Sequence, residues 1–107
     1  MEDNGTQNET QDALDEARRE IDEVDRQMAA LFARRMAAAA HIATYKAQRG
    51  LPVRDPSREE ALLARNAALV DETIRPHYLH FMEAMLEESR SYQHRLMENS
   101  PDEISKG

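Results

Sequence analysis

The sequence contains no cysteine and no tryptophan, and it has little glycine, proline or aromatic residue. Without cysteine the chain can form no disulfide, no thiolate metal site and no cysteine nucleophile. Only 3 glycines and 4 prolines occur among 107 residues, and aromatic residues make up 5%. Alanine, leucine, methionine, glutamate and arginine are abundant instead, so helix propensity is high along nearly the whole chain. The composition therefore predicts an all-α fold.

The chain also lacks long apolar runs and an excess of positive charge. Residues 1–11 are polar and acidic, which predicts neither a secretory signal nor a membrane anchor, and the expected location is the cytoplasm. A net charge of -7 disfavours general binding to nucleic acid or to anionic membranes, because such binding depends on neutralising phosphates. We expect neither partner, and any basic site must be local.

The length and apolar content indicate one small domain. With 107 residues, of which 40% are hydrophobic, the core is only just large enough to stand alone. We expect a disordered head over 1–11, a domain over 12–98 and a disordered tail over 99–107.

A heptad-like pattern predicts one long helix from about Asp12 to about Arg49. Gly50 and Pro52 then end the helix and lead into an extended loop. The apolar seam of this helix, spaced by threes and fours, consists of Leu14, Ala17, Ile21, Val24, Met28, Leu31, Ala38, Ile42 and Tyr45.

Two shorter helices are expected after the loop. Asp55 should cap a helix from Pro56 to about Val70, with Glu59 near enough to return a capping interaction. Residues 71–75 are predicted to form a turn, and Pro76 opens a third helix that ends near Met97. One face of that third helix carries Phe81, Met82, Met85, Leu86, Tyr92 and Leu96.

The length of the first helix predicts self-association. About 35 residues form a rod of ~50 Å, whereas a compact domain of this size has a radius of gyration of only ~13 Å. The seam along the rod would stay partly in water unless a second long helix covered it. A homodimer is therefore expected.

Candidate binding residues interrupt the apolar seam. Arg35 occupies a seam position, and Lys46 follows eleven residues later on nearly the same face, rotated by ~20°. Buried cations without partners cost several kcal/mol, so these two should meet either an anionic ligand or protein carboxylates. Arg18 is ~25 Å along the same helix from Arg35, so only an antiparallel partner could bring it there. The candidate carboxylates are Asp25, Glu59 and Glu88.

The later helices carry weaker signals of the same kind. Ser89 and Gln93 lie four residues apart, so they share the apolar face of the third helix or simply face solvent. Arg58 and Glu59 begin the second helix, where charged residues are common as caps. The histidines show no convincing metal-ligand spacing and are interpreted as structural or exposed: His41, His77, His80 and His94.

In combination these residues resemble the all-helical chorismate mutases, over about Asp12 to Leu96. The resemblance implies an intertwined homodimer of three-helix chains, without metal or cofactor, whose substrate is chorismate. It rests on segments 18–25, 33–36, 45–46, 52–59 and 88–89 with Gln93, in this order and spacing. The implied site comprises Arg35, Lys46, Asp55, Arg58, Glu59, Ser89 and Gln93, with Arg18 from the neighbouring subunit.

The resemblance also implies a role for each residue. Chorismate is a dianion that rearranges in one concerted step, so its enzyme needs to restrain the reactive conformer and stabilise charge growing on the ether oxygen. Arg35 and Arg18 of the partner subunit would bind the two carboxylates. Lys46 and Gln93 would donate to the ether oxygen, and Glu59 would accept from the C4 hydroxyl. Asp55 would support the contact made by Glu59, and Ser89 would assist one carboxylate. Arg58 would cover the ring.

Three alternatives remain at this point. Aminodeoxychorismate mutases share nearly all of these residues, because a carboxylate can accept from a hydroxyl or an ammonium. Isochorismate-pyruvate lyases resemble the same fold, but segment 53–59 looks more like that of the mutases. The third alternative is a non-catalytic dimerisation or regulatory module. The presence of Arg35, Ser89 and Gln93 argues against it, because such a module would be more stable with apolar residues at these positions. A noncovalent shikimate-pathway enzyme partner also remains open, as does feedback regulation.

Overall fold

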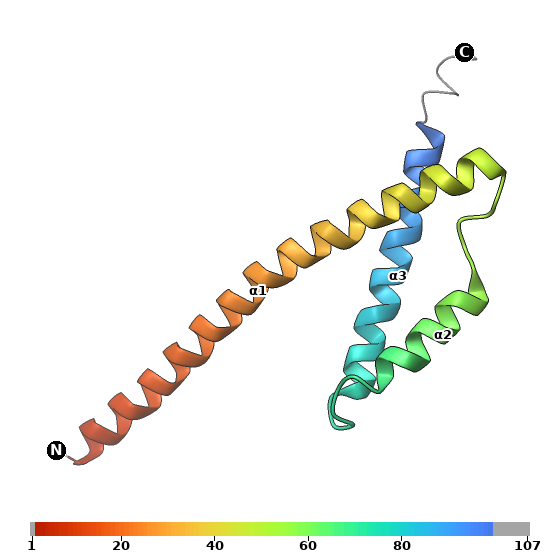
Figure 1. The fold of residues 1–107 in the computed structure, drawn as a ribbon. Helices are drawn as coiled ribbons and strands as arrows, with labels where there is room; N and C mark the ends of the chain where they lie inside the picture. The colour runs from red at the N-terminus through yellow and green to blue at the C-terminus, as the bar shows by residue number, and fades with distance from the viewer. Residues whose placement is uncertain (1, 100–107) are drawn as a thin grey trace. The chain divides into compact units, whose positions relative to one another are not determined.

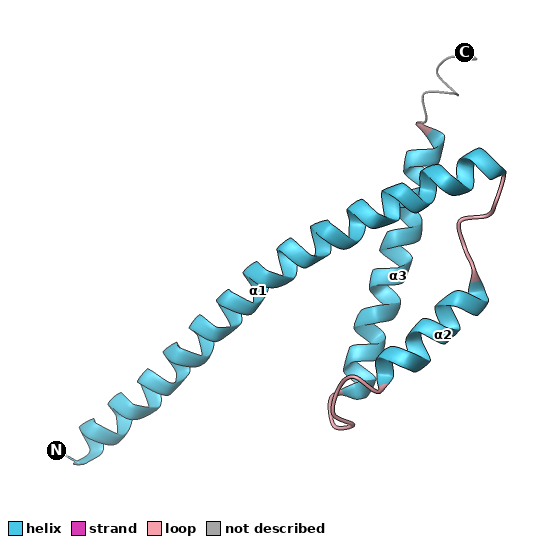
Figure 2. Cartoon of the chain, in the orientation of Figure 1, coloured by secondary structure: helices cyan, strands magenta, loops and turns pink. Residues whose placement is uncertain are grey.

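The computed structural model describes residues 2–99, and the side chains of 9–99. This part of the chain forms three helices and no strand (Figures 1 and 2): α1 (Glu2–Arg49), α2 (Pro56–Ala67) and α3 (Arg75–Glu98). The predicted all-α fold is confirmed. The chain divides into two compact units, Met1–Arg35 and Met36–Gly107.

In the first unit, α1 begins at Glu2 rather than at Asp12. Residues 2–11, expected to be a disordered head, are helical in the structure, whereas Met1 lies outside the described residues. The physical reason is that extending an existing helix adds one hydrogen bond per residue, whereas starting a new helix is costly. Polar residues can therefore continue a helix that they would not begin.

The apolar seam of this unit is exposed in the single chain. Ile21 and Leu31 each keep 57% of their surface accessible, and Val24 keeps 41%. A helix whose apolar stripe faces water gains little from hydrophobic burial. This seam is therefore available for another protein surface.

In the second unit, α1 ends as the sequence predicts. Gly50 has a φ of 65°, a left-handed conformation that costs glycine nothing. The Leu51 N–H donates to the Lys46 carbonyl at 2.9 Å, the bond that closes a Schellman motif. This turn leads the chain into the loop before α2.

The helix α2 begins at the predicted residue but ends three residues early, at Ala67 rather than Val70. The cause is Arg75, whose guanidinium donates to the carbonyls of Ala67 at 2.6 Å and Val70 at 2.9 Å. These carbonyls are satisfied without continuing the helix. The helices α2 and α3 then pack as an antiparallel pair (Figure 1).

The turn before α3 is held by Asp71 and is one residue shorter than the predicted 71–75, because α3 begins at Arg75 rather than at Pro76. The Thr73 hydroxyl and backbone N–H donate to its carboxylate, and these bonds lower the pKa of the Asp71 carboxyl. Because the folded pKa is depressed, this stabilisation is present above the ordinary pKa of aspartate and is lost as pH falls through the lowered value.

The helix α3 starts at Arg75, ends at Glu98 and is capped by Asn99. The other residues of the predicted tail, 100–107, lie outside the described residues. Phe81, expected on the apolar face, is 52% exposed. The buried positions of α3 follow a spacing of four, three and four and so form one face of the helix. Phe81 precedes the first of them by one residue, which rotates it by about 100° away from that position.

The buried side chains of the second unit come from three elements. The buried residues are Ala39 and Ala43 of α1, Val53 of the loop, and Met82, Leu86, Ser89 and Gln93 of α3.

None of the helices in the described residues combines the length and apolar character that a membrane crossing requires.

Candidate functional site

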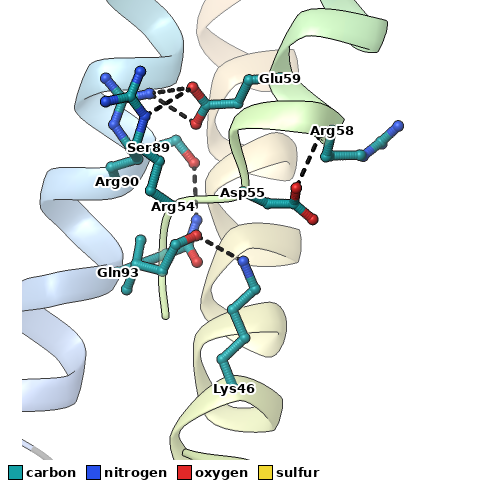
Figure 3. Close-up of polar contacts among 9 residues, drawn as sticks. Lys46, Arg54, Asp55, Arg58, Glu59, Ser89, Arg90 and Gln93 are labelled. Atoms are coloured by element: carbon teal, nitrogen blue, oxygen red, sulfur yellow. Dashed lines mark hydrogen bonds and ion pairs between the residues drawn. The ribbon is translucent and has the colours of Figure 1, made fainter. Parts of the chain in front are cut away.

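Four of the predicted site residues come together in the second unit. Figure 3 shows them in one close-up: Lys46 of α1 is bonded to the Val53 carbonyl, Glu59 of α2 to Arg90, and Gln93 of α3 to Ser89. The end of α1 supplies an ammonium, the first turn of α2 a carboxylate, and the buried face of α3 a hydroxyl and an amide. Residues far apart in the sequence therefore form one polar cluster.

Lys46 is fixed by the loop that follows its own helix. Its ammonium donates to the carbonyl oxygen of buried Val53 at 2.7 Å, and the side chain is half-buried. An ammonium has three donors, so two remain for a ligand. The bond to Val53 reduces the freedom of the long side chain before a ligand arrives, which favours binding.

Ser89 and Gln93 are buried, not solvent-facing, although both are polar. They are only 6% and 7% exposed, and the Gln93 Nε2 donates to the Ser89 Oγ at 3.3 Å. The buried Gln93 Oε1 accepts no hydrogen bond from the described residues. Buried polar groups in native proteins are almost always hydrogen-bonded, so this oxygen can accept a hydrogen bond from a donor that the described residues do not supply.

Glu59 forms a paired carboxylate through a residue that the sequence analysis missed. The Nη1 of Arg90 lies 2.7 Å from both Glu59 oxygens, and the Nε of Arg54 lies 3.8 Å from Oε1. No backbone N–H of the described residues donates to the Glu59 carboxylate, so the expected capping interaction is not observed. The signal was present: position 90 is four after buried Leu86 and three before Gln93, at the edge of the same face.

Asp55 and Arg58 lie beside this cluster with different roles. The Asp55 Oδ1 accepts from the Arg58 backbone N–H at 3.1 Å, which confirms Asp55 as the N-cap of α2. The Arg58 side chain is exposed and points away from Glu59 and Gln93 (Figure 3). The predicted contact of Arg58 with a substrate ring remains a prediction.

The capping role gives a stability prediction. Asp55→Ala should lower the free energy of unfolding by about 1 kcal/mol, whereas Asp55→Asn keeps an acceptor and should lose only a few tenths. Urea denaturation of both variants measures this, with Ser57→Ala as the control because Ser57 is exposed in the same turn. Equal losses for Asp55→Ala and Asp55→Asn would show that the negative charge, rather than the cap bond, stabilises the helix.

The other two predicted residues, Arg18 and Arg35, belong to the first unit. Arg18 is exposed and Arg35 is half-buried. The ion pairs found within residues 9–99 include neither Arg35 nor Lys46. Glu59, one of the carboxylates considered for these cations, is paired with Arg90 instead.

All four histidines are exposed.

The cluster in the second unit favours an anionic ligand. The cations Lys46, Arg54 and Arg90 lie in or beside this cluster, and the Glu59 carboxylate is already paired with Arg90 and Arg54, although the whole chain has a net charge of -7. No group of three or more histidine and carboxylate side chains that could hold a metal ion occurs in the described part of the chain. The available chemistry is electrostatic binding and hydrogen-bond donation.

Comparison with known proteins identifies the family. Residues 17–94 match the family described as chorismate mutase type II. The chain belongs to this family. Membership confirms the predicted resemblance and makes the chain an isomerase of the chorismate mutase type.

Two relatives agree with this family. The chain is 31% identical over 98 residues to a chorismate mutase of Methanocaldococcus jannaschii, covering 87% of this chain and 96% of the relative. It is also 42% identical over 52 residues to the T-protein of Haemophilus influenzae, covering 49% of this chain but only 14% of that longer protein. No solved structure matches the chain.

Proposed function

We propose that this chain converts chorismate to prephenate by a concerted Claisen rearrangement, at a site completed by a second copy and without metal or cofactor. The observation that carries the proposal is that the second unit holds both the Lys46 ammonium, fixed by the Val53 carbonyl, and the buried Gln93 amide, bonded to Ser89. The family match supports the reaction, and the cluster supports the way it is catalysed.

Lys46 and Gln93 are proposed to stabilise the transition state. As the ether C–O bond breaks and the new C–C bond forms, negative charge grows on the ether oxygen. Lys46 retains two N–H donors, and the Gln93 amide retains one N–H beyond its bond to Ser89. Fixed donors that meet developing charge are among the largest contributions to catalysis. The two residues therefore form the proposed donor pair.

Glu59, Ser89, Asp55 and Arg58 are proposed to hold the ground state in the reactive conformer. Glu59 accepts from the C4 hydroxyl, with Asp55 supporting the first turn of α2 in which Glu59 lies. Ser89 assists one carboxylate, and Arg58 turns to cover the ring. Restraint of this kind lowers the barrier by removing unproductive conformers before reaction.

Arg35 and Arg18 of a second copy are proposed to bind the two carboxylates. The planar guanidinium matches a carboxylate with two hydrogen bonds. The exposed seam of α1 supports a homodimer, because Val24, Met28 and Leu31 are 41%, 44% and 57% exposed in one chain. Pairing of two such seams would bury this surface and bring in Arg18 from outside.

The direct test is the product formed from chorismate by the purified protein in EDTA. Ultraviolet absorbance follows chorismate, mass spectrometry identifies the product, and a coupled assay detects pyruvate. We expect prephenate and no pyruvate. The same assay is repeated with isochorismate, from which release of pyruvate would support a lyase instead. No conversion of chorismate or isochorismate would support a non-catalytic dimerisation module.

Two expectations are untested and stay predictions. One is the cytoplasmic location expected from the polar sequence of residues 1–11. The other is a noncovalent partner among the shikimate-pathway enzymes, for which size-exclusion chromatography with candidate enzymes is the measurement.

A further inference from the structure

We infer that Arg90 makes this site select a hydroxyl over an ammonium at the substrate carbon that Glu59 contacts. The inference rests on the proposed function, because it assumes that Glu59 meets the C4 substituent. Chorismate has a hydroxyl at that carbon, and its 4-amino-4-deoxy analogue has an ammonium. Arg90 would be a specificity-determining residue that acts through Glu59.

The first observation is the geometry of the ion pair. Arg90 reaches from α3 to Glu59 on α2 and places one nitrogen 2.7 Å from both carboxylate oxygens. The side chains of Arg90 and Glu59 are only 24% and 17% exposed. A partly buried, charge-assisted pair of this kind is screened less by solvent than an exposed one.

The second observation is the charge around Glu59. The Arg54 Nε lies 3.8 Å from the same carboxylate, with its side chain 64% exposed. Two guanidinium groups therefore surround one carboxylate, and the group as a whole carries positive charge. A cationic substituent brought to this point would be repelled by both guanidinium groups.

A hydroxyl can still bind in this environment. An ionised carboxylate has about four lone-pair positions, and a single Arg90 nitrogen shared between the two oxygens leaves some of them available. A neutral O–H donor gains a hydrogen bond without meeting a net electrostatic penalty. An unpaired carboxylate at this position would accept from either substituent and would favour the ammonium.

A purely structural role for Arg90 makes a different prediction. If the pair only joined α2 to α3, its loss would reduce the activity toward both substrates by the same factor. The ratio of the two kcat/KM values cancels any loss of folded protein. That ratio is therefore the measurement that separates selectivity from structure.

The experiment measures kcat/KM for chorismate and for 4-amino-4-deoxychorismate with the unmodified chain, Arg90→Gln and Arg90→Lys. The unmodified chain should prefer chorismate. Arg90→Gln removes the charge and should shift the ratio toward the amino substrate by about tenfold, an effect moderated by the partial exposure of the pair. Arg90→Lys keeps the charge and should keep the preference.

Arg95→Gln is the matched control. It removes one positive charge from the same helix, but Arg95 is exposed and forms no ion pair within the described residues. The ratio should stay within about twofold of the unmodified value, because exposed charges are screened.

Each outcome decides the inference. A shift in Arg90→Gln alone supports it, as does amino-substrate conversion that appears only in that variant. An unchanged ratio in Arg90→Gln, or a preference of the unmodified chain for the amino substrate, overturns the inference while leaving a mutase in place. No conversion of either substrate overturns the proposed function and the inference with it.

Discussion

Lys46→Ala should lower the turnover of chorismate at least ~100-fold, because a fixed donor to developing charge contributes about 3–4 kcal/mol to the barrier. The ammonium is held by the Val53 carbonyl at 2.7 Å, so its position is fixed before substrate binds. Alanine removes the charge and both available donors. Steady-state kinetics with chorismate measures the loss, which should appear mainly in kcat.

The matched control is Arg49→Ala. Arg49 lies in the last turn of the same helix, where its guanidinium stacks on Tyr45 at 3.7 Å from the ring centroid. Its loss should change turnover by no more than about twofold, as is usual for exposed residues outside a site. Circular dichroism should show that both variants are folded. Near-normal turnover of Lys46→Ala would refute the proposed role of Lys46.

Gln93→Glu should make the reaction depend on acid. The new side chain is ionised at neutral pH and replaces an N–H donor with a negative oxygen, so turnover should fall about 100-fold. Burial favours the neutral form and raises the carboxyl pKa above its ordinary value. As pH falls through that pKa, the protonated carboxyl regains a donor and turnover should rise. The unmodified amide does not titrate over this range.

The pH dependence of kcat between pH 4 and 8 measures this effect. Gln93→Leu is the control, since it removes the donor at every pH and should remain slow in acid. If Gln93→Glu were equally slow at low and neutral pH, donation by residue 93 would not contribute to catalysis.

Much of the fold follows from local sequence signals. The Gly50 turn and the Asp55 cap act over a few residues, and both are where the sequence predicts them. The end of α2 depends on Arg75, a residue of the next helix whose guanidinium takes two carbonyls. Such a tertiary contact leaves no periodic signal, so the helix was predicted three residues too long.

The site was predictable to the extent that polar residues interrupt apolar faces. Ser89 and Gln93 were found in this way, and both are buried. Arg90 was missed because one charged residue at the edge of a helix face normally extends into solvent. Its partner, Glu59, is 31 residues away in the sequence. Only the packing of α2 on α3 shows that the two meet.

Assembly of the site from two copies is the central claim, and mixing two defective variants tests it most directly. Arg18→Ala should disable the contribution to the partner, and Lys46→Ala should disable a chain's own site. In a heterodimer one site has both defects and the other has neither. After unfolding and refolding together in equal amounts, about a quarter of the unmodified activity should return, because half of the dimers are mixed and each has one intact site. Activity that stays at the level of the separate variants would contradict a site shared between two chains.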